Sequence, residues 1–171
     1  MNLGTKEKLK QLMDWSAALW GGFISGIVFF VVNILLSQIV LGSPWVYLRI
    51  IASIIMGPRI LPPPATFDIQ VFFAALIVHF AISIIGAIII SFAVYRWGLI
   101  VGFIGGGVLG LAFYVINFYA LSFFFPWVFP YRSWIMMASH IVYGALAGGI
   151  YELLEIEEFV IDEDSKGDDH V

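Results

Sequence analysis

Four polar side chains that could do chemistry lie inside long apolar stretches of this sequence. They are Asn33, His79, Asn117 and His140, one in each of four stretches. Counted from the same side of these stretches, they lie about 7 to 12 residues deep, which is roughly 10 to 18 Å along a helix. Polar groups in a lipid-solvated segment are costly, so they are candidates for function. We predict that the four form one polar cluster if their side chains face inward.

Four kinds of chemistry fit these residues. The favoured one is hydrogen bonding between helices, which requires no cofactor. His79 and His140 could instead be the axial ligands of a haem b, although their depths differ by about five residues, or roughly 7 Å. A copper site is the other alternative, because Met136 and Met137 precede His140, with His79 across the bundle, and thioether and imidazole ligands together suit Cu(I). A proton or solute path through the same residues is also open.

The composition indicates the elements that must position these residues. The chain is 61% hydrophobic and 12% charged, against about 45 to 50% and about 25% in a typical soluble domain. Segments 16–40, 69–95 and 98–125 carry no ionised side chain and exceed the roughly 20 residues that a helix needs to cross a bilayer, and 134–151 is shorter but sufficient. We predict an all-α integral membrane protein, a bundle of four transmembrane helices with spans at about 14–40, 68–95, 97–125 and 133–152.

A fifth, shorter helix is predicted at about 44–56. Pro44 suits its first turn and Gly57 its end. At about 20 Å it is too short to span, so we expect an interfacial or re-entrant helix between spans 1 and 2, with Arg49 and Ser53 facing the lipid headgroups. Arg49 and Arg59 are then candidate contacts for lipid or another anion. Thr66 is the predicted cap of the second span.

Glycines recur at every fourth position along three of the spans, a spacing that puts them on one helix face and allows close helix packing. Whether the partner helix belongs to this chain or to another is left open. The glycines are Gly22 and Gly26 in the first span, Gly98, Gly102, Gly106 and Gly110 in the third, and Gly144 and Gly148 in the fourth.

The two ends of the chain differ in charge. Residues 1–13 mix leucines with three lysines and predict a short amphipathic helix on the membrane surface, or a solvated terminus. Residues 152–171 form an acidic tail, in which Leu153, Ile156 and Val160 predict that the last helix continues beyond the membrane. The predicted inner loops and ends carry five Lys and Arg against three outside, which places both termini in the cytoplasm, in a bacterial cytoplasmic membrane.

Several functions are disfavoured by what the sequence lacks. It has no cysteine, no basic patch for nucleic acid and no plausible catalytic set, so we expect no enzyme and no catalytic residues. The first functional hypothesis is therefore a non-catalytic accessory or assembly subunit of a larger membrane complex, with membrane lipid and other membrane subunits as partners. The alternatives are a redox or metal-handling protein built on His79 and His140, and a small transporter or channel.

Overall fold

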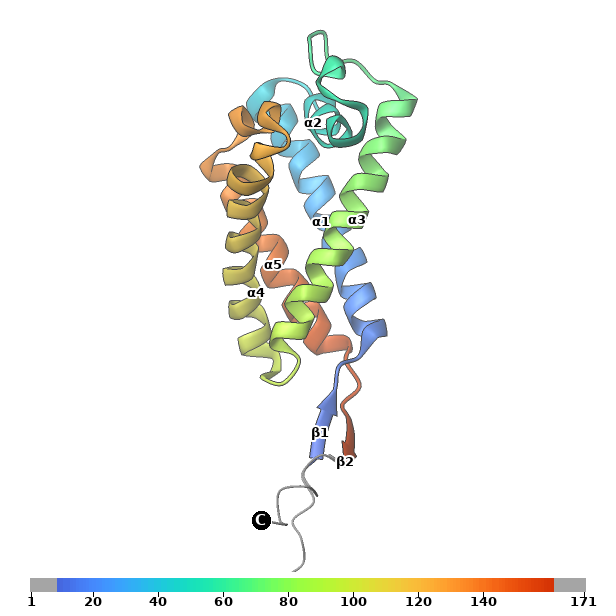
Figure 1. Ribbon diagram of the computed structural model, residues 1–171, viewed down its shortest axis with the longest axis vertical. Coiled ribbons are helices and arrows are strands. Elements are labelled where there is room, and N and C mark those ends of the chain that lie inside the picture. The colour runs from blue at the N-terminus through green and yellow to red at the C-terminus, as the bar shows by residue number, and fades with distance from the viewer. Residues whose placement is uncertain (1–8, 162–171) are drawn as a thin grey trace, which may run out of the picture.

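The computed structural model describes residues 9–161, and four long helices standing side by side make up most of it (Figure 1). Each is long and apolar enough to cross a membrane, so the predicted four-helix bundle is present. The third of these long helices, α4, continues through a π-helical turn and a short 3-10 turn. The elements are α1 (Trp15–Leu41), α3 (Ile69–Val94), α4 (Gly98–Val115), η2 (Ile116–Ala120), η3 (Leu121–Phe123) and α5 (Trp134–Leu154).

Side-chain caps fix where three of these helices begin. Asp14 accepts from the Ala17 N–H at 3.0 Å, and the Ser133 hydroxyl accepts from the Met136 N–H at 3.1 Å. Asp68, and not Thr66 as predicted, caps α3, accepting the backbone N–H groups of residues 70 and 71. The aspartate is favoured because its negative charge lies against the positive end of the helix dipole.

The short helix α2 (Trp45–Met56) lies across one end of the bundle, as Figure 1 shows. Its Tyr47, Leu48 and Ala52 are buried in a cluster with side chains of α1 and α3. The expectation that Ser53 faces the headgroups is wrong, because Ser53 is fully buried. Arg49 is half-buried and donates to the carbonyl oxygens of Ile60 (2.6 Å) and Thr66 (3.2 Å), so it fastens the loop that follows α2, and its contact with lipid headgroups stays a prediction.

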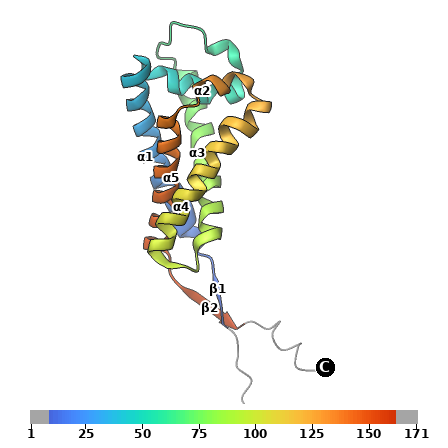
Figure 2. The same ribbon diagram turned by 90° about the vertical axis from the view of Figure 1, so that its left-hand side faces the viewer.

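At the other end the chain leaves the bundle as a two-stranded ribbon. Strand β1 (Leu9–Leu12) pairs antiparallel with β2 (Glu158–Ile161), and the ribbon extends beyond the helices (Figure 2). This corrects two predictions: residues 9–12 are not helical, and α5 ends at Leu154 and does not continue through Ile156 and Val160. A short helix outside the bundle has no packing partner, whereas Phe159 and Val160 favour a strand. The rest of segment 1–13 and of the acidic tail lies outside the described residues.

Glycines set the close packing of the helices, and the partner helices belong to this chain. A Cβ atom added at Gly22 or Gly26 of α1 would lie 2.9 Å from the Cβ of Ala87 or 3.1 Å from that of Ser83, both on α3. On α4, Gly102, Gly106 and Gly110 lie against α5, where Gly144 and Gly148 face them, and an added Cβ would strike backbone atoms there. Gly98 takes no part, since it has a positive φ of 75° at the start of α4 and no atom within 4 Å of its added Cβ.

Candidate functional site: a polar cavity inside the bundle

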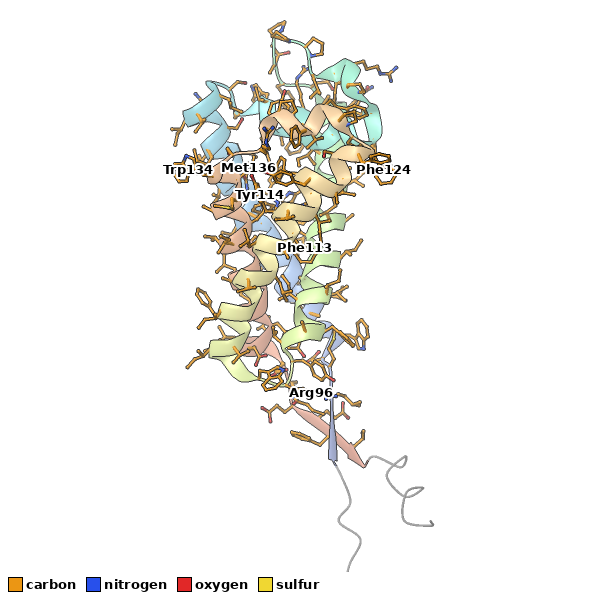
Figure 3. The ribbon with its side chains drawn as sticks, turned by 60° about the vertical axis from the view of Figure 1, so that its left-hand side comes forward. Arg96, Phe113, Tyr114, Phe124, Trp134 and Met136 are labelled. Atoms are coloured by element: carbon orange, nitrogen blue, oxygen red, sulfur yellow. The ribbon has the colours of Figure 1, made fainter. Side chains whose placement is uncertain are left out.

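A cavity of about 80 Å³ lies beneath α2, between all the long helices. We call it the central cavity. Most of its lining is apolar, and Met136, one of its lining residues, is seen near the α2 end of the bundle in Figure 3. Its polar lining consists of Tyr47, His79, Ser83, Asn117, Tyr131 and His140.

His79 of α3 is held by hydrogen bonds at both of its ring nitrogens. Its Nε2 lies 2.9 Å from the carbonyl oxygen of Gly26, and its Nδ1 lies 3.2 Å from the Tyr47 hydroxyl. A carbonyl only accepts, so Nε2 carries a proton. The Ser83 hydroxyl also lies 3.4 Å from Nε2. Burial favours the neutral ring, in which Nδ1 accepts from Tyr47, and the ring joins α1, α2 and α3.

His140 on α5 is arranged in the same way with different partners. Its Nδ1 lies 2.8 Å from the carbonyl oxygen of Met136, so this nitrogen is the donor. Its Nε2 then accepts from the side-chain amide of Asn117, at 3.3 Å. Asn117 lies in the π-helical turn η2, and turns of this kind often occur at functional sites.

Phe29 of α1 contacts both imidazoles. Its ring stacks on His79 at a centroid distance of 5.5 Å and meets His140 edge-to-face at 4.9 Å. Both histidines thus lie against one aromatic ring inside one cavity. The sequence pattern did not single out Phe29 or Tyr47, because neither is polar enough or isolated enough to stand out in an apolar stretch.

Asn33 does not join the other three predicted polar residues. It is fully buried, donates to the carbonyl oxygen of Phe29 at 2.8 Å and accepts from the Ser139 hydroxyl at 3.3 Å. It lines a neighbouring cavity of about 160 Å³, which we call the entrance cavity because it reaches Leu41 and Arg132 at the α2 end. The predicted cluster of four is therefore a group of three with Asn33 beside it.

A third cavity of about 180 Å³ opens sideways between α3 and α4. We call it the lateral cavity. It shares Phe29, Ser83, Asn117 and His140 with the central cavity and reaches Phe113, which lies deeper along the bundle than Met136 in Figure 3. Its rim residues Ile82, Ile85 and Ile116 are exposed on the outer face.

The central cavity adjoins both of the others, since it shares lining residues with each, and the cavities lie mainly in the α2 half of the bundle. The other half is closed by a core of small and aromatic side chains and by the glycine contacts of α4 and α5. The core residues there are Ala17, Ala18, Ala87, Ile90, Val94, Ala147 and Tyr151, and Tyr143 of the same cluster borders the lateral cavity.

The residues present do not fit a haem held by both histidines. All four ring nitrogens of His79 and His140 have protein partners, and a cavity of about 80 Å³ is far below the roughly 300 Å³ and more of typical cofactor sites. For copper, Met136 lines the cavity with both histidines, whereas Met137 does not. Within residues 9–161, no three His, Cys, Asp or Glu side chains are grouped as a metal site. Hydrogen bonding is the chemistry that this geometry favours.

Arg59, the other arginine predicted to contact lipid or another anion, lies in a different environment from Arg49. Arg59 is exposed in the short turn η1 (Pro58–Ile60), next to the loop that Arg49 holds. Of the two side chains, Arg59 is the more exposed, since Arg49 is half-buried. A contact between Arg59 and lipid phosphate stays a prediction.

Comparisons with protein-family models, curated proteins and solved structures give no match to this chain. Its function must therefore be argued from the cavity and from the surface of the bundle.

Proposed function

We propose that this chain is a non-catalytic integral membrane protein that binds a small solute and passes it on, as a small transporter or channel. The observation that carries the proposal is the row of adjoining cavities that runs from Arg132 at the α2 end to His79, Asn117 and His140 inside the bundle. The closed half beyond them would act as the barrier that a regulated path needs. The structure would then correspond to a form accessible from the α2 end.

The surface of the bundle supports placement in a membrane. Large apolar side chains are exposed along all four long helices, for example Ile39, Ile77, Ile100 and Val142. Such a surface is stable in lipid and would aggregate in water. Tryptophans lie near both ends, Trp15 and Trp97 at one and Trp45 and Trp134 at the other, as expected at the two interfaces of a bilayer.

Cysteine accessibility tests the solute path directly, because the chain has no cysteine of its own. Ser83 and Ser91 both lie on α3 and are 3% and 0% exposed, but only Ser83 lines the cavities. In reconstituted vesicles we expect S83C to react with the small neutral reagent methyl methanethiosulfonate at least about ten times faster than S91C. A tenfold rate ratio corresponds to a difference of about 1.4 kcal/mol in the activation free energy of labelling.

The S91C variant is the matched control for this experiment, since it places the same thiol on the same helix in the closed half. Equal rates for S83C and S91C, or no reaction at either position, would contradict a path into the bundle. A charged sulfonate version of the reagent, which cannot cross lipid, would show from which side the path opens.

The accessory-subunit hypothesis is the second candidate, and the lateral cavity favours it. This cavity leaves Ile85 58% exposed beside Gly86 and Phe113, a place where a helix of another subunit could pack. Lipid chains would cover the same groove, so this argument is weaker than the one for a solute path. A photo-crosslinking residue at Ile85 in native membranes should then give one discrete protein adduct, and the same residue at Ile100 should give none.

A further inference from the structure

Two segments of the chain resemble each other in sequence. Residues 22–33 read GFISGIVFFVVN, and residues 106–117 read GGVLGLAFYVIN. Five of the twelve positions are identical, namely both glycines, the phenylalanine, one valine and the final asparagine. The same order then continues in both halves, with Pro-Trp-Val at 44–46 and 126–128, an arginine at 49 and 132, and a histidine at 79 and 140.

The packing of the helices follows the same register in both halves. Gly26 lies against Ser83, four residues after His79, and Gly110 lies between His140 itself and Gly144, four residues after it. One helical turn further on, Gly22 lies against Ala87, eight residues after His79. Gly106 lies between Gly144 and Gly148, which is eight residues after His140.

The path of the chain is also the same twice. In each half a long helix leads to the α2 end, a short helical element lies at that end, and a second long helix returns (Figure 1). The short element begins within the Pro-Trp-Val sequence, at Trp45 in the first half and at Pro126 in the second. In the first half these elements are α1, α2 and α3. In the second they are α4 with its terminal turns, η4 (Pro126–Tyr131) and α5. The sequence similarity, the contacts and the topology therefore agree on the same equivalences.

From this we infer that the segments Trp15–Val94 and Gly98–Leu154 are two copies of one helical hairpin, and that the equivalent His79 and His140 form one site for a small uncharged solute between them. The solute part of this inference rests on the proposed function. Membrane proteins with internal repeats often bind their substrates at the interface between the repeats. Here that interface is the central cavity, to which both copies contribute a histidine.

The copies have diverged in a way that leaves room for a solute. Asn33 bonds to Ser139 in the other copy, which ties α1 to α5. Its equivalent Asn117 bonds instead to His140, within its own copy. Among the described residues, Asn117 therefore makes no side-chain bond to α3 that would match the bond of Asn33 to α5. The lateral cavity lies at this second interface. One interface between the copies is closed, and the equivalent one is open.

The charge of the lining defines the class of solute. Among the described residues, no Asp, Glu, Lys or Arg lines the central or the lateral cavity, and burial without such a counter-charge favours the neutral form of both imidazoles. An ion would lose much of its hydration there without a counter-charge. Asn117 and Ser83 still offer polar atoms to a hydroxyl or amide group. A cavity of about 80 Å³ holds roughly the volume of two or three water molecules. This suits a molecule as small as urea, and glycerol would extend into the adjoining lateral cavity.

Solute flux in reconstituted vesicles tests this inference. We expect the full-length protein to speed the entry of glycerol or urea, measured by stopped-flow light scattering, and to leave the entry of potassium acetate unchanged. Replacing His79 or His140 by Phe removes the partner that positions Ser83 or Asn117 for the solute, so it should slow entry about tenfold, the effect of about one weakened hydrogen bond. S91A, in the closed half, is the matched control.

The outcomes separate this inference from the proposed function. Variants H79F and H140F, each combined with S83C, should keep the labelling of the introduced thiol, which shows that the path is intact. Labelling of this thiol together with flux that responds to one histidine only would overturn the shared site. Flux of acetate but of neither neutral probe would overturn the solute class. Failure of the S83C protein itself to react with the reagent would instead overturn the proposed function.

Discussion

At the scale of single residues, Asp14 holds together the end of the bundle opposite α2. One carboxylate oxygen accepts from the Ala17 N–H at 3.0 Å and caps α1, and the other accepts from the Ile156 N–H at 3.1 Å, beyond α5. The Ala17 bond is the main cause that lowers the pKa of Asp14 below its usual 3.8, and the Ile156 bond adds to it, while partial burial acts in the opposite direction. The folded state therefore binds this proton more weakly than the unfolded state does.

The lowered pKa of Asp14 predicts a pH dependence of stability. The carboxylate should stabilise the fold fully above about pH 4, and this contribution should be lost as the pH falls through the lower folded-state pKa. D14N keeps a capping oxygen but cannot bond to both segments, so we expect it to be less stable at pH 7 by about 0.5 to 2 kcal/mol. The difference from wild type should shrink towards about pH 3. Thermal unfolding in detergent, followed by circular dichroism, measures it.

D68N is the control for this prediction. Asp68 also caps a helix, but a single oxygen accepts both N–H groups and no distant segment is involved. Asparagine can take over that role at little cost. If D14N and D68N behaved alike across the whole pH range, the link between Asp14 and Ile156 would contribute nothing to stability.

At the scale of helices, the contact between α4 and α5 depends on the absence of side chains. A Cβ atom at Gly106 would collide with the carbonyl oxygen of Gly144, and backbone atoms cannot turn aside as a flexible side chain can. We expect G106A to push the two helices apart and to lower the free energy of unfolding by about 1 to 3 kcal/mol, as overpacking does. Because His140 and Asn117 lie on this pair of helices, S83C labelling should also change in G106A.

The neighbouring glycine provides the control for G106A. A Cβ at Gly105 would meet its nearest atom, a Val94 methyl group, at 3.5 Å, which is an ordinary contact. G105A should therefore be neutral or slightly stabilising, since alanine favours helix over glycine by up to about 1 kcal/mol. A G106A protein as stable as G105A would show that α4 and α5 do not pack as closely as the structure has them.

The helices were largely predictable from the sequence, and the exceptions have physical causes. Long apolar runs and capping residues such as Asp14 and Ser133 act locally, so they mark helix ends well. The strands β1 and β2 were missed because each is stable only when paired with a segment at the other end of the chain. The buried setting of Ser53 and the turn η2 depend on packing that no local pattern encodes.

At the scale of the whole molecule, the candidate site was predictable only in part. The sequence identified His79, Asn117 and His140, because a polar residue in an apolar span is conspicuous. It could not place Asn33 with Ser139, since that pairing depends on the rotation of α1 against α5. Nor did polarity point to Phe29, which contacts both imidazoles, or to Tyr47, which bonds to His79. Two of these positions, Phe29 and Asn33, recur as Phe113 and Asn117 in the repeated segment, so the internal repeat marks both of them, whereas polarity marks only Asn33.

The arrangement of the whole chain in a membrane gives the last prediction. The paired strands bring both ends of the described chain together, on the side opposite α2 and the loop that follows it. With five positive residues on the predicted inner side and three on the outer side, the α2 end should face outward. In intact bacterial cells we expect a membrane-impermeant maleimide to label R59C at once and E157C only after permeabilisation. Labelling of E157C alone would reverse the orientation, and with it the side from which a solute enters. Labelling of both variants in intact cells would be incompatible with a bundle that separates these two positions by a bilayer.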